Sequence, residues 1–295
     1  MRFWRQRELW LMLIPGLLFY AIYRYGPMFG LVVAFKDYSP FLGVWESPWA
    51  GFKHFERLFT NPDFWMLFKN TLTLGSLSLV IFFPSCIIYS LLLNEVLNKK
   101  AKKIYQTISY LPTFLSIVIV CSIFTNMFAV AGFVNDIIEF FGGERINFML
   151  KPEYYYLVYM VSDLWAGIGS GSIVYLAALS GVDQNLYEAA ELDGCSRLKR
   201  IWHITIPSIM PTIVTMFLLR IGNIIRIAPD KTLLLATDAV RSVSDIFGSY
   251  VYRVGIIQRS YSYAAAVGIF ESILAAIILV CANKVSKRTT GEGLW

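Results

Sequence analysis

The chain has 295 residues, of which 57% are hydrophobic and only 16% are charged, and its mean hydropathy is +0.57. Soluble domains carry about a quarter charged residues, so this composition excludes an ordinary soluble globule and favours a protein of the lipid bilayer. The net charge of +6 does not indicate nucleic-acid binding, because the basic residues gather in short blocks beside apolar segments.

Six segments are apolar and long enough to cross a bilayer, which takes roughly 20 residues. They predict an all-α integral membrane protein with six transmembrane helices. The first segment is too long for a cleaved signal peptide and lacks a small-residue cleavage site, so we expect it to remain as a membrane helix. The predicted spans are residues 9–35, 71–93, 104–128, 154–179, 204–225 and 264–282.

Four basic blocks set the predicted orientation, since lysine and arginine concentrate on the cytoplasmic side of membrane proteins. All four lie on one side of a six-span topology, which places both termini in the cytoplasm. The last outer segment fits this rule less well, because Lys231, Arg241, Arg253 and Arg259 face only three aspartates there. The four blocks are Arg2, Arg5 and Arg7; Lys99, Lys100, Lys102 and Lys103; Arg197, Lys199 and Arg200; and Lys284, Lys287 and Arg288.

Two outer segments have distinctive side chains. Residues 41–59 carry aromatic residues among polar ones, including Trp45, Trp49 and Phe52. They predict either an aromatic belt at the membrane interface or a docking surface for an extracellular partner. Residues 245–252 (DIFGSYVY) predict a short amphipathic segment on the outer side.

The inner loop at residues 183–207 (DQNLYEAAELDGCSRLKRIWHITIP) differs from the short, charged connectors elsewhere. Its pattern predicts two short helices joined at a turn. Asn185 can cap the first helix and Ser196 the second, while Gly194 supplies the positive φ that ends the first. Pro207 is expected to begin the next membrane helix at its first turn.

The first of these two helices has a surface suited to protein contact. The small side chains of Ala189 and Ala190 let another protein approach closely, and Glu188 and Asp193 place charges at the rim. These features favour a helix seated in the groove of a partner protein. A generic amphipathic helix at the membrane interface is the alternative from the residues alone.

The same loop resembles the EAA loop of binding-protein-dependent ABC importer permeases. The family usually has an alanine after the glycine, where this chain has Cys195. Four further stretches, AFKDYSPFLGV, GFKHF, YVYRVGI and YSYAAAVGIFES, are similar to lipoprotein-dependent polysaccharide and oligosaccharide permeases. The residues that carry the EAA resemblance, and with it an expected role in coupling to an ATPase, are Glu188, Ala189, Ala190, Asp193, Gly194 and Pro207.

This resemblance implies a type I ABC importer fold, with one permease domain over residues 1–295, a core at 71–283 and the coupling loop at 183–207. It also implies a bacterial plasma-membrane subunit that forms half of the pathway for a sugar or oligosaccharide. The implied partners are a second permease, two cytoplasmic ATPases and an extracellular solute-binding lipoprotein. We expect alternating access driven by ATP, with the coupling loop as its lever.

The chain itself is predicted not to be an enzyme. It has no G-x-x-x-x-G-K-[ST] loop, so we expect ATP and magnesium to be bound by the partner ATPase. Neither the cysteines nor the histidines, His54 and His203, have the spacing of a metal site. The alternatives are an ABC permease for peptides, amino acids or ions, an ion-coupled secondary transporter and a membrane enzyme. A secondary transporter would normally show repeated halves with broken helices and paired membrane acids, which are not evident.

Ionisable groups inside the spans are candidates for the substrate path, since burying them in lipid is costly. Arg220 and Glu271 could instead neutralise each other between neighbouring helices, and Asp163 could face a helix neighbour or a water-filled crevice. The stretch WAGIGSGS could offer an indole face to a sugar ring, or could serve close helix packing. The candidate path residues are Asp163, Trp165, Ser170, Arg220, Asn223 and Glu271.

Overall fold

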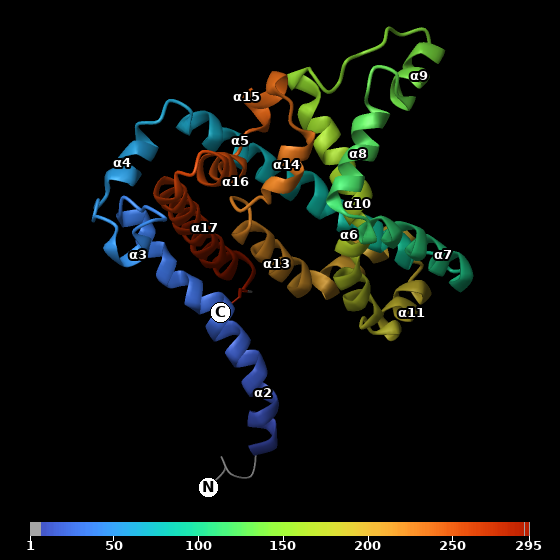
Figure 1. The fold of residues 1–295 in the computed structure, drawn as a ribbon. Coiled ribbons are helices and arrows are strands. Elements are labelled where there is room, and N and C mark those ends of the chain that lie inside the picture. The colour runs from blue at the N-terminus through green and yellow to red at the C-terminus, as the bar shows by residue number, and fades with distance from the viewer. Residues whose placement is uncertain (1–6, 292, 295) are drawn as a thin grey trace. The chain divides into compact units, whose positions relative to one another are not determined.

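The structure is a computed structural model that describes residues 7–291, 293 and 294 (Figure 1). Over these residues the chain is helical, with one isolated β-bridge between Lys36 and Trp49 and no strand. The all-α prediction is therefore confirmed. Arg2 and Arg5, which belong to the first basic block of the predicted topology, lie outside the described residues.

Five helices are long and apolar enough to cross a membrane, and a bent helix pair provides a sixth span if its halves count together. The five helices overlap five of the predicted spans and contain three of them, residues 71–93, 154–179 and 264–282, while the span predicted at residues 204–225 ends earlier, at Gly222. The helices run over Trp10–Phe35, Phe64–Asn94, Pro152–Ser180, Arg197–Gly222 and Tyr261–Thr289.

Several of these spans are composites of shorter helical segments. The α-helices within the spans are α2 (Arg7–Tyr20), α5 (Phe64–Leu77), α6 (Phe83–Asn94), α10 (Pro152–Ser180), α12 (Arg197–Arg200), α13 (Ile206–Gly222) and α17 (Tyr261–Thr290). The bent pair is α7 (Lys99–Tyr110) with its 3₁₀ turn, followed by α8 (Ile117–Met127). The shorter connecting helices are α3 (Gly43–Glu46), α4 (Lys53–Phe59), α9 (Phe133–Phe140), α11 (Gln184–Leu192), α14 (Pro229–Leu235), α15 (Arg241–Ser244) and α16 (Phe247–Tyr252).

The predicted third span, residues 104–128, is not a continuous helix. Its two halves, Lys99–Phe114 and Ile117–Met127, bend by 101° at the break between them (Figure 1). Pro112 lies in a 3₁₀ turn at the end of the first half, and Leu115 is extended. The Oγ of Ser116 accepts a hydrogen bond from the backbone N–H of Ile119 at 3.3 Å and so caps the second half. A proline followed by an N-cap residue stops one helix and starts another.

Pro207 lies in the first turn of α13, as predicted, but the helical backbone before it does not end. The helix runs without a break from Arg197 to Gly222, and a π-helical turn at Ile201–Thr205 precedes the proline. The second span has the same arrangement, with a π-helical turn at Ser78–Phe82 before Pro84. Proline lacks an N–H and clashes with the carbonyl of residue i−4 in an α-helix. A π-turn changes the hydrogen-bond spacing from i−4 to i−5, so the helix can continue through the proline.

The chain divides into two compact units, which are described separately. One contains the residues up to Phe64 together with Tyr250–Phe270, and the other contains Trp65–Ser249 with the residues from Glu271 onward. The prediction of one permease domain over residues 1–295 stays a prediction.

In the larger unit α10 packs closely against α6 and α7. Gly169 of α10 leaves no room for a side chain, because an added Cβ would lie 2.2 Å from the carbonyl oxygen of Ser109 on α7. Gly171, two residues on, approaches α6 in the same way, where the Sγ of Cys86 would be 2.5 Å from an added Cβ. The glycine-rich stretch of this helix therefore serves close helix packing.

We expect Gly169→Ala to destabilise the protein by about 1–3 kcal/mol, because the added methyl group meets rigid backbone rather than a flexible side chain. The measurement is the unfolding temperature of the purified protein in detergent. Gly16→Ala in α2 is the matched control, since its Cβ would meet nothing within 4 Å. Equal unfolding temperatures for the two variants would show that α7 can move away at no cost.

The first part of the predicted amphipathic segment, residues 245–249 of the larger unit, is buried except for the half-buried Gly248. Its position on the outer side of the membrane stays a prediction. Ile246 and Phe247 are fully buried. The backbone N–H of Phe247 donates to the Oγ1 of Thr71 at 3.1 Å, and the amide of Asn70 donates to the carbonyl of Asp245 at 2.9 Å. These bonds to α5 hold the segment inside the helix bundle.

The smaller unit contains the aromatic segment. The ring of Phe35 stacks on Trp49 with 6.0 Å between ring centroids, and the Nζ of Lys53 donates to Asp37 at 2.8 Å, which lowers the pKa of that carboxyl. Trp45 and Phe52 remain largely exposed. Exposed aromatic side chains suit both an interfacial belt and a docking surface, so both interpretations stay predictions.

Candidate functional site

The predicted coupling loop forms a short helix with a defined beginning and end. Asp183 caps the helix instead of Asn185, since its Oδ1 accepts the backbone N–H of Asn185 at 3.0 Å. Gly194 has φ +72° at the other end, as predicted. Two backbone bonds close the turn, from the N–H of Gly194 to Glu191 at 3.0 Å and from the N–H of Cys195 to Ala190 at 2.9 Å. These two hydrogen bonds around a glycine with left-handed backbone form the Schellman motif.

Ser196 occupies the N-cap position of α12, as predicted. Its hydroxyl makes no capping hydrogen bond within the part of the chain that the structure covers. The first turn of α12 is therefore held by backbone geometry rather than by the expected side-chain bond.

The helix α11 is anchored on one side and exposed on the other. The hydroxyl of Tyr187 is 2.9 Å from the Oγ1 of Thr205, and its ring packs on a cluster that includes Leu179 and Ile209. Leu192 is 90% exposed. Of the predicted coupling residues, Ala190 is half-buried, and the others are exposed: Glu188, Ala189, Asp193, Gly194 and Pro207. The exposed face fits a partner protein, and the coupling role stays a prediction.

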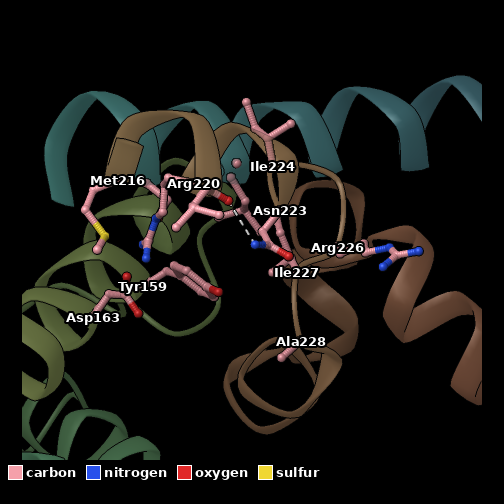
Figure 2. A pocket seen from close by; sticks show the side chains of 13 residues that line it. Tyr159, Asp163, Met216, Arg220, Asn223, Ile224, Arg226, Ile227 and Ala228 are labelled. Atoms are coloured by element: carbon pink, nitrogen blue, oxygen red, sulfur yellow. Dashed lines mark hydrogen bonds between the residues drawn. The ribbon is translucent and has the colours of Figure 1, made fainter. Parts of the chain in front are cut away.

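A second candidate site is a cavity of about 460 Å³ in the larger unit (Figure 2). It brings together three of the six predicted path residues: Asp163 from α10, Arg220 from α13 and Asn223, which follows α13. The other residues that line it are Leu74, Gly75, Ser78, Tyr159, Met216, Leu219, Ile224, Arg226, Ile227 and Ala228.

Three predicted path residues do not line this cavity. The indole of Trp165 packs edge-on against the ring of Phe124, with centroids 5.6 Å apart. The hydroxyl of Ser170 donates to the carbonyl of Gly167 at 3.1 Å. Glu271 on α17 is half-buried. Because Trp165 is still 41% exposed and Ser170 bonds only within its own helix, their role in the substrate path stays a prediction.

Asp163 is paired with a lysine that the sequence did not single out. The Nζ of Lys231 on α14 lies 3.0 Å from the Oδ1 of Asp163, donates to the carbonyl of Tyr159 at 2.8 Å, and lies 4.0 Å from the centre of the Tyr159 ring. Lys231 is only 6% exposed. Burial lowers its pKa, and the charge of Asp163 opposes that shift.

The burial of Lys231 explains part of the excess of basic residues in the last outer segment of the predicted topology. Lys231 counted against the positive-inside rule as an outer basic residue, yet it lies inside the bundle as the counter-ion of Asp163. The signal in the sequence was an acid within one span and a lysine in an apolar outer segment. Nothing local indicated that the two meet.

Arg220 does not neutralise Glu271, because among the described residues it forms no ion pair. One of its terminal nitrogens donates to the hydroxyl of Ser78, and its guanidinium carbon lies 4.5 Å from the centre of the Phe82 ring. Nearby, the amide of Asn223 donates to the carbonyl of Leu219 at 2.9 Å, as the dashed line in Figure 2 shows. Its carbonyl oxygen is left for other partners.

The region searched for metal sites holds no group of three or more histidine, cysteine, aspartate or glutamate side chains. The expectation that this chain binds no metal stays a prediction.

Comparison with known proteins gives consistent matches over nearly the whole chain. Residues 87–288 match the family model "Binding-protein-dependent transport system inner membrane component". The chain is 44% identical to the polygalacturonan/rhamnogalacturonan transport system permease protein YteP and to Protein LplB, both of Bacillus subtilis (strain 168). Each alignment covers 99% of this chain, and they cover 91% and 92% of the two relatives.

A solved structure has the same fold. The chain is 37% identical to one chain of a bacterial alginate ABC transporter in complex with an alginate pentasaccharide-bound periplasmic protein. The TM-score is 0.90, with 99% of this chain and 98% of the other covered. The resemblance carried by the EAA loop is thereby confirmed, together with the type I ABC importer permease fold. The chain belongs to the family of inner membrane components of binding-protein-dependent transport systems.

Proposed function

We propose that the chain is the permease subunit of an ATP-binding-cassette importer for saccharides and forms half of the translocation path. The observation that carries this proposal is the match at 44% identity over 292 residues to a permease named for polygalacturonan and rhamnogalacturonan transport. A cavity inside the helix bundle with Asp163, Arg220 and Asn223 in its lining supports it, since a transport pathway needs polar groups inside the membrane region.

The proposed partners follow from the exposed surfaces and the relatives. We propose that α11 seats in a groove of a cytoplasmic ATPase, which binds ATP and magnesium and performs the hydrolysis. A second permease would complete the pathway, and an extracellular solute-binding lipoprotein would deliver the sugar. Both termini then lie in the cytoplasm of a bacterial cell. The crystallised relative in complex with a periplasmic binding protein supports the last of these partners.

The proposed mechanism is alternating access. When ATP closes the two ATPase subunits, their grooves move the helix between Asp183 and Gly194 inward. Because Tyr187 ties α11 to Thr205 at the base of the fifth span, that movement is transmitted to the membrane helices. The pathway opens outward to accept the sugar, and hydrolysis resets it.

The test is co-purification of the chain with the proteins encoded beside it, followed by ATPase assays in lipid vesicles with a panel of oligosaccharides. We expect a second permease and an ATPase to co-purify, and one saccharide with its binding protein to raise ATP turnover. A chain that purifies without an ATPase, and whose uptake collapses with a proton uncoupler but not with ATP depletion, would instead be a secondary transporter.

A further inference from the structure

The charges at the cavity do not balance. Asp163, Arg220 and Arg226 line it, and Lys231 reaches Asp163 from α14. Arg226 donates to the hydroxyl of Ser272 on α17 at 2.8 Å. Among these four charged side chains, three cations therefore stand against one anion. Because Lys231 pairs with Asp163 and Arg226 is bonded to α17, Arg220 is the cation without a charged partner at the cavity.

Arg220 is held in place by uncharged partners. The hydroxyl of Ser78 accepts one of its hydrogen bonds, and the ring of Phe82 lies under the guanidinium at 4.5 Å. A guanidinium has five N–H donors in a fixed fork, and no other hydrogen bond of Arg220 is found among the described residues. Figure 2 shows this side chain pointing toward Tyr159 and Asp163, across the cavity. A fixed fork with unused donors suits a planar anion.

We propose that Arg220 binds a carboxylate of the transported sugar, so that the cargo is an acidic oligosaccharide containing uronic acid residues. This inference rests on the proposed function. The guanidinium would donate two parallel hydrogen bonds to the carboxylate. Asn223 is exposed and its side-chain carbonyl oxygen is available to sugar hydroxyls, while the largely buried Tyr159 also lines the cavity. A volume of about 460 Å³ is within the ordinary range of ligand sites.

Lys231 has a supporting role in this arrangement. Without it, the carboxylate of Asp163 would face the same cavity as an uncompensated negative charge and would repel an acidic sugar. Because Asp163 pairs with Lys231 at 3.0 Å, the positive charge of Arg220 can attract an acidic sugar. The site thus selects by charge through two residues, one that touches the sugar and one that acts through Asp163.

The test compares variants in the complete transporter, reconstituted in vesicles with its binding protein. The probes are a tri-galacturonate and its carboxyl-reduced neutral counterpart. In Arg220→Gln we expect ATP turnover stimulated by the acidic probe to fall about 10-fold or more, the loss expected for a hydrogen bond to a charged group. Arg220→Lys keeps the positive charge but lacks the forked guanidinium, so its stimulated ATP turnover should fall less. Arg145→Gln is the matched control, because Arg145 lies outside the cavity and pairs with the exposed Asp136 and Glu139; it should change turnover by less than about threefold.

Three results separate the possibilities. The proposal is supported if Arg220→Gln loses ATP turnover stimulated by the acidic probe but keeps that stimulated by the neutral probe, with an unchanged unfolding temperature of the complex. Stimulation of the unaltered transporter by the neutral probe alone, or an equal loss with both probes in Arg220→Gln, overturns it while the saccharide importer stands. Failure of every saccharide to stimulate turnover removes the proposed function, and the inference falls with it.

Discussion

The Lys231→Met variant is expected to be less stable than the unaltered protein by about 3 kcal/mol, because it leaves the half-buried Asp163 without its counter-ion. The side chain of Asp163 is 29% exposed, so water can solvate part of the unpaired carboxylate. The loss of stability therefore lies at the low end of the range for broken buried ion pairs. The measurement is the unfolding temperature of the purified protein in detergent, together with its yield from membranes.

The double variant Lys231→Met/Asp163→Asn separates two effects of the single variant, the unpaired charge of Asp163 and the altered packing where Lys231 was. We expect it to recover most of the lost stability, because both charges are then absent and no buried anion is left unpaired. Lys53→Met is the control for an exposed pair, since Lys53 and Asp37 are 64% and 45% exposed, and should cost at most about 1 kcal/mol. If the single Lys231→Met variant unfolds at the same temperature as the unaltered protein, the ion pair has no structural role.

The Gly194→Val variant is expected to lower transport about tenfold while the protein still inserts and remains folded. Gly194 has φ +72°, and a residue with a side chain pays about 1–2 kcal/mol for that conformation, more if it is β-branched. Relieving the strain would unwind the end of α11 and break the bond from Cys195 to Ala190. Because an exposed helix end has few other contacts, we expect the loss to appear in coupling rather than in stability.

Gly194→Asn is the matched control, because asparagine adopts left-handed backbone more readily than other residues with side chains. It should retain most of the transport activity. The measurements are sugar uptake and sugar-stimulated ATP turnover at equal expression. An added Cβ at this position meets nothing within 4 Å, so a steric clash within the chain cannot explain a difference between the two variants. Transport at the unaltered rate in Gly194→Val would contradict the proposed lever.

The sequence by itself determined the class of protein, the approximate positions of five spans and the glycine-terminated helix of the coupling loop. These features depend on local chemistry. Hydropathy over about 20 residues decides whether a segment can enter a bilayer, and the left-handed turn at Gly194 needs only a residue without a Cβ. The same locality explains the error at Asn185 and the unexpected continuity of the helix before Pro207. An aspartate two residues earlier competes for the cap, and a π-turn can absorb a proline that otherwise marks a helix start.

Only the tertiary structure decided which polar groups meet inside the bundle. Asp163 and Lys231 are 68 residues apart in the chain, and Arg220 and Ser78 are 142 apart. Neither hydropathy nor turn chemistry carries information over such separations. The contacts arise because α10, α13 and α14 pack so that desolvated charges find partners, and an unpaired charge there would be costly. The packing of the helices, rather than any local motif, therefore gave Asp163 its counter-ion and left Arg220 open to the cavity.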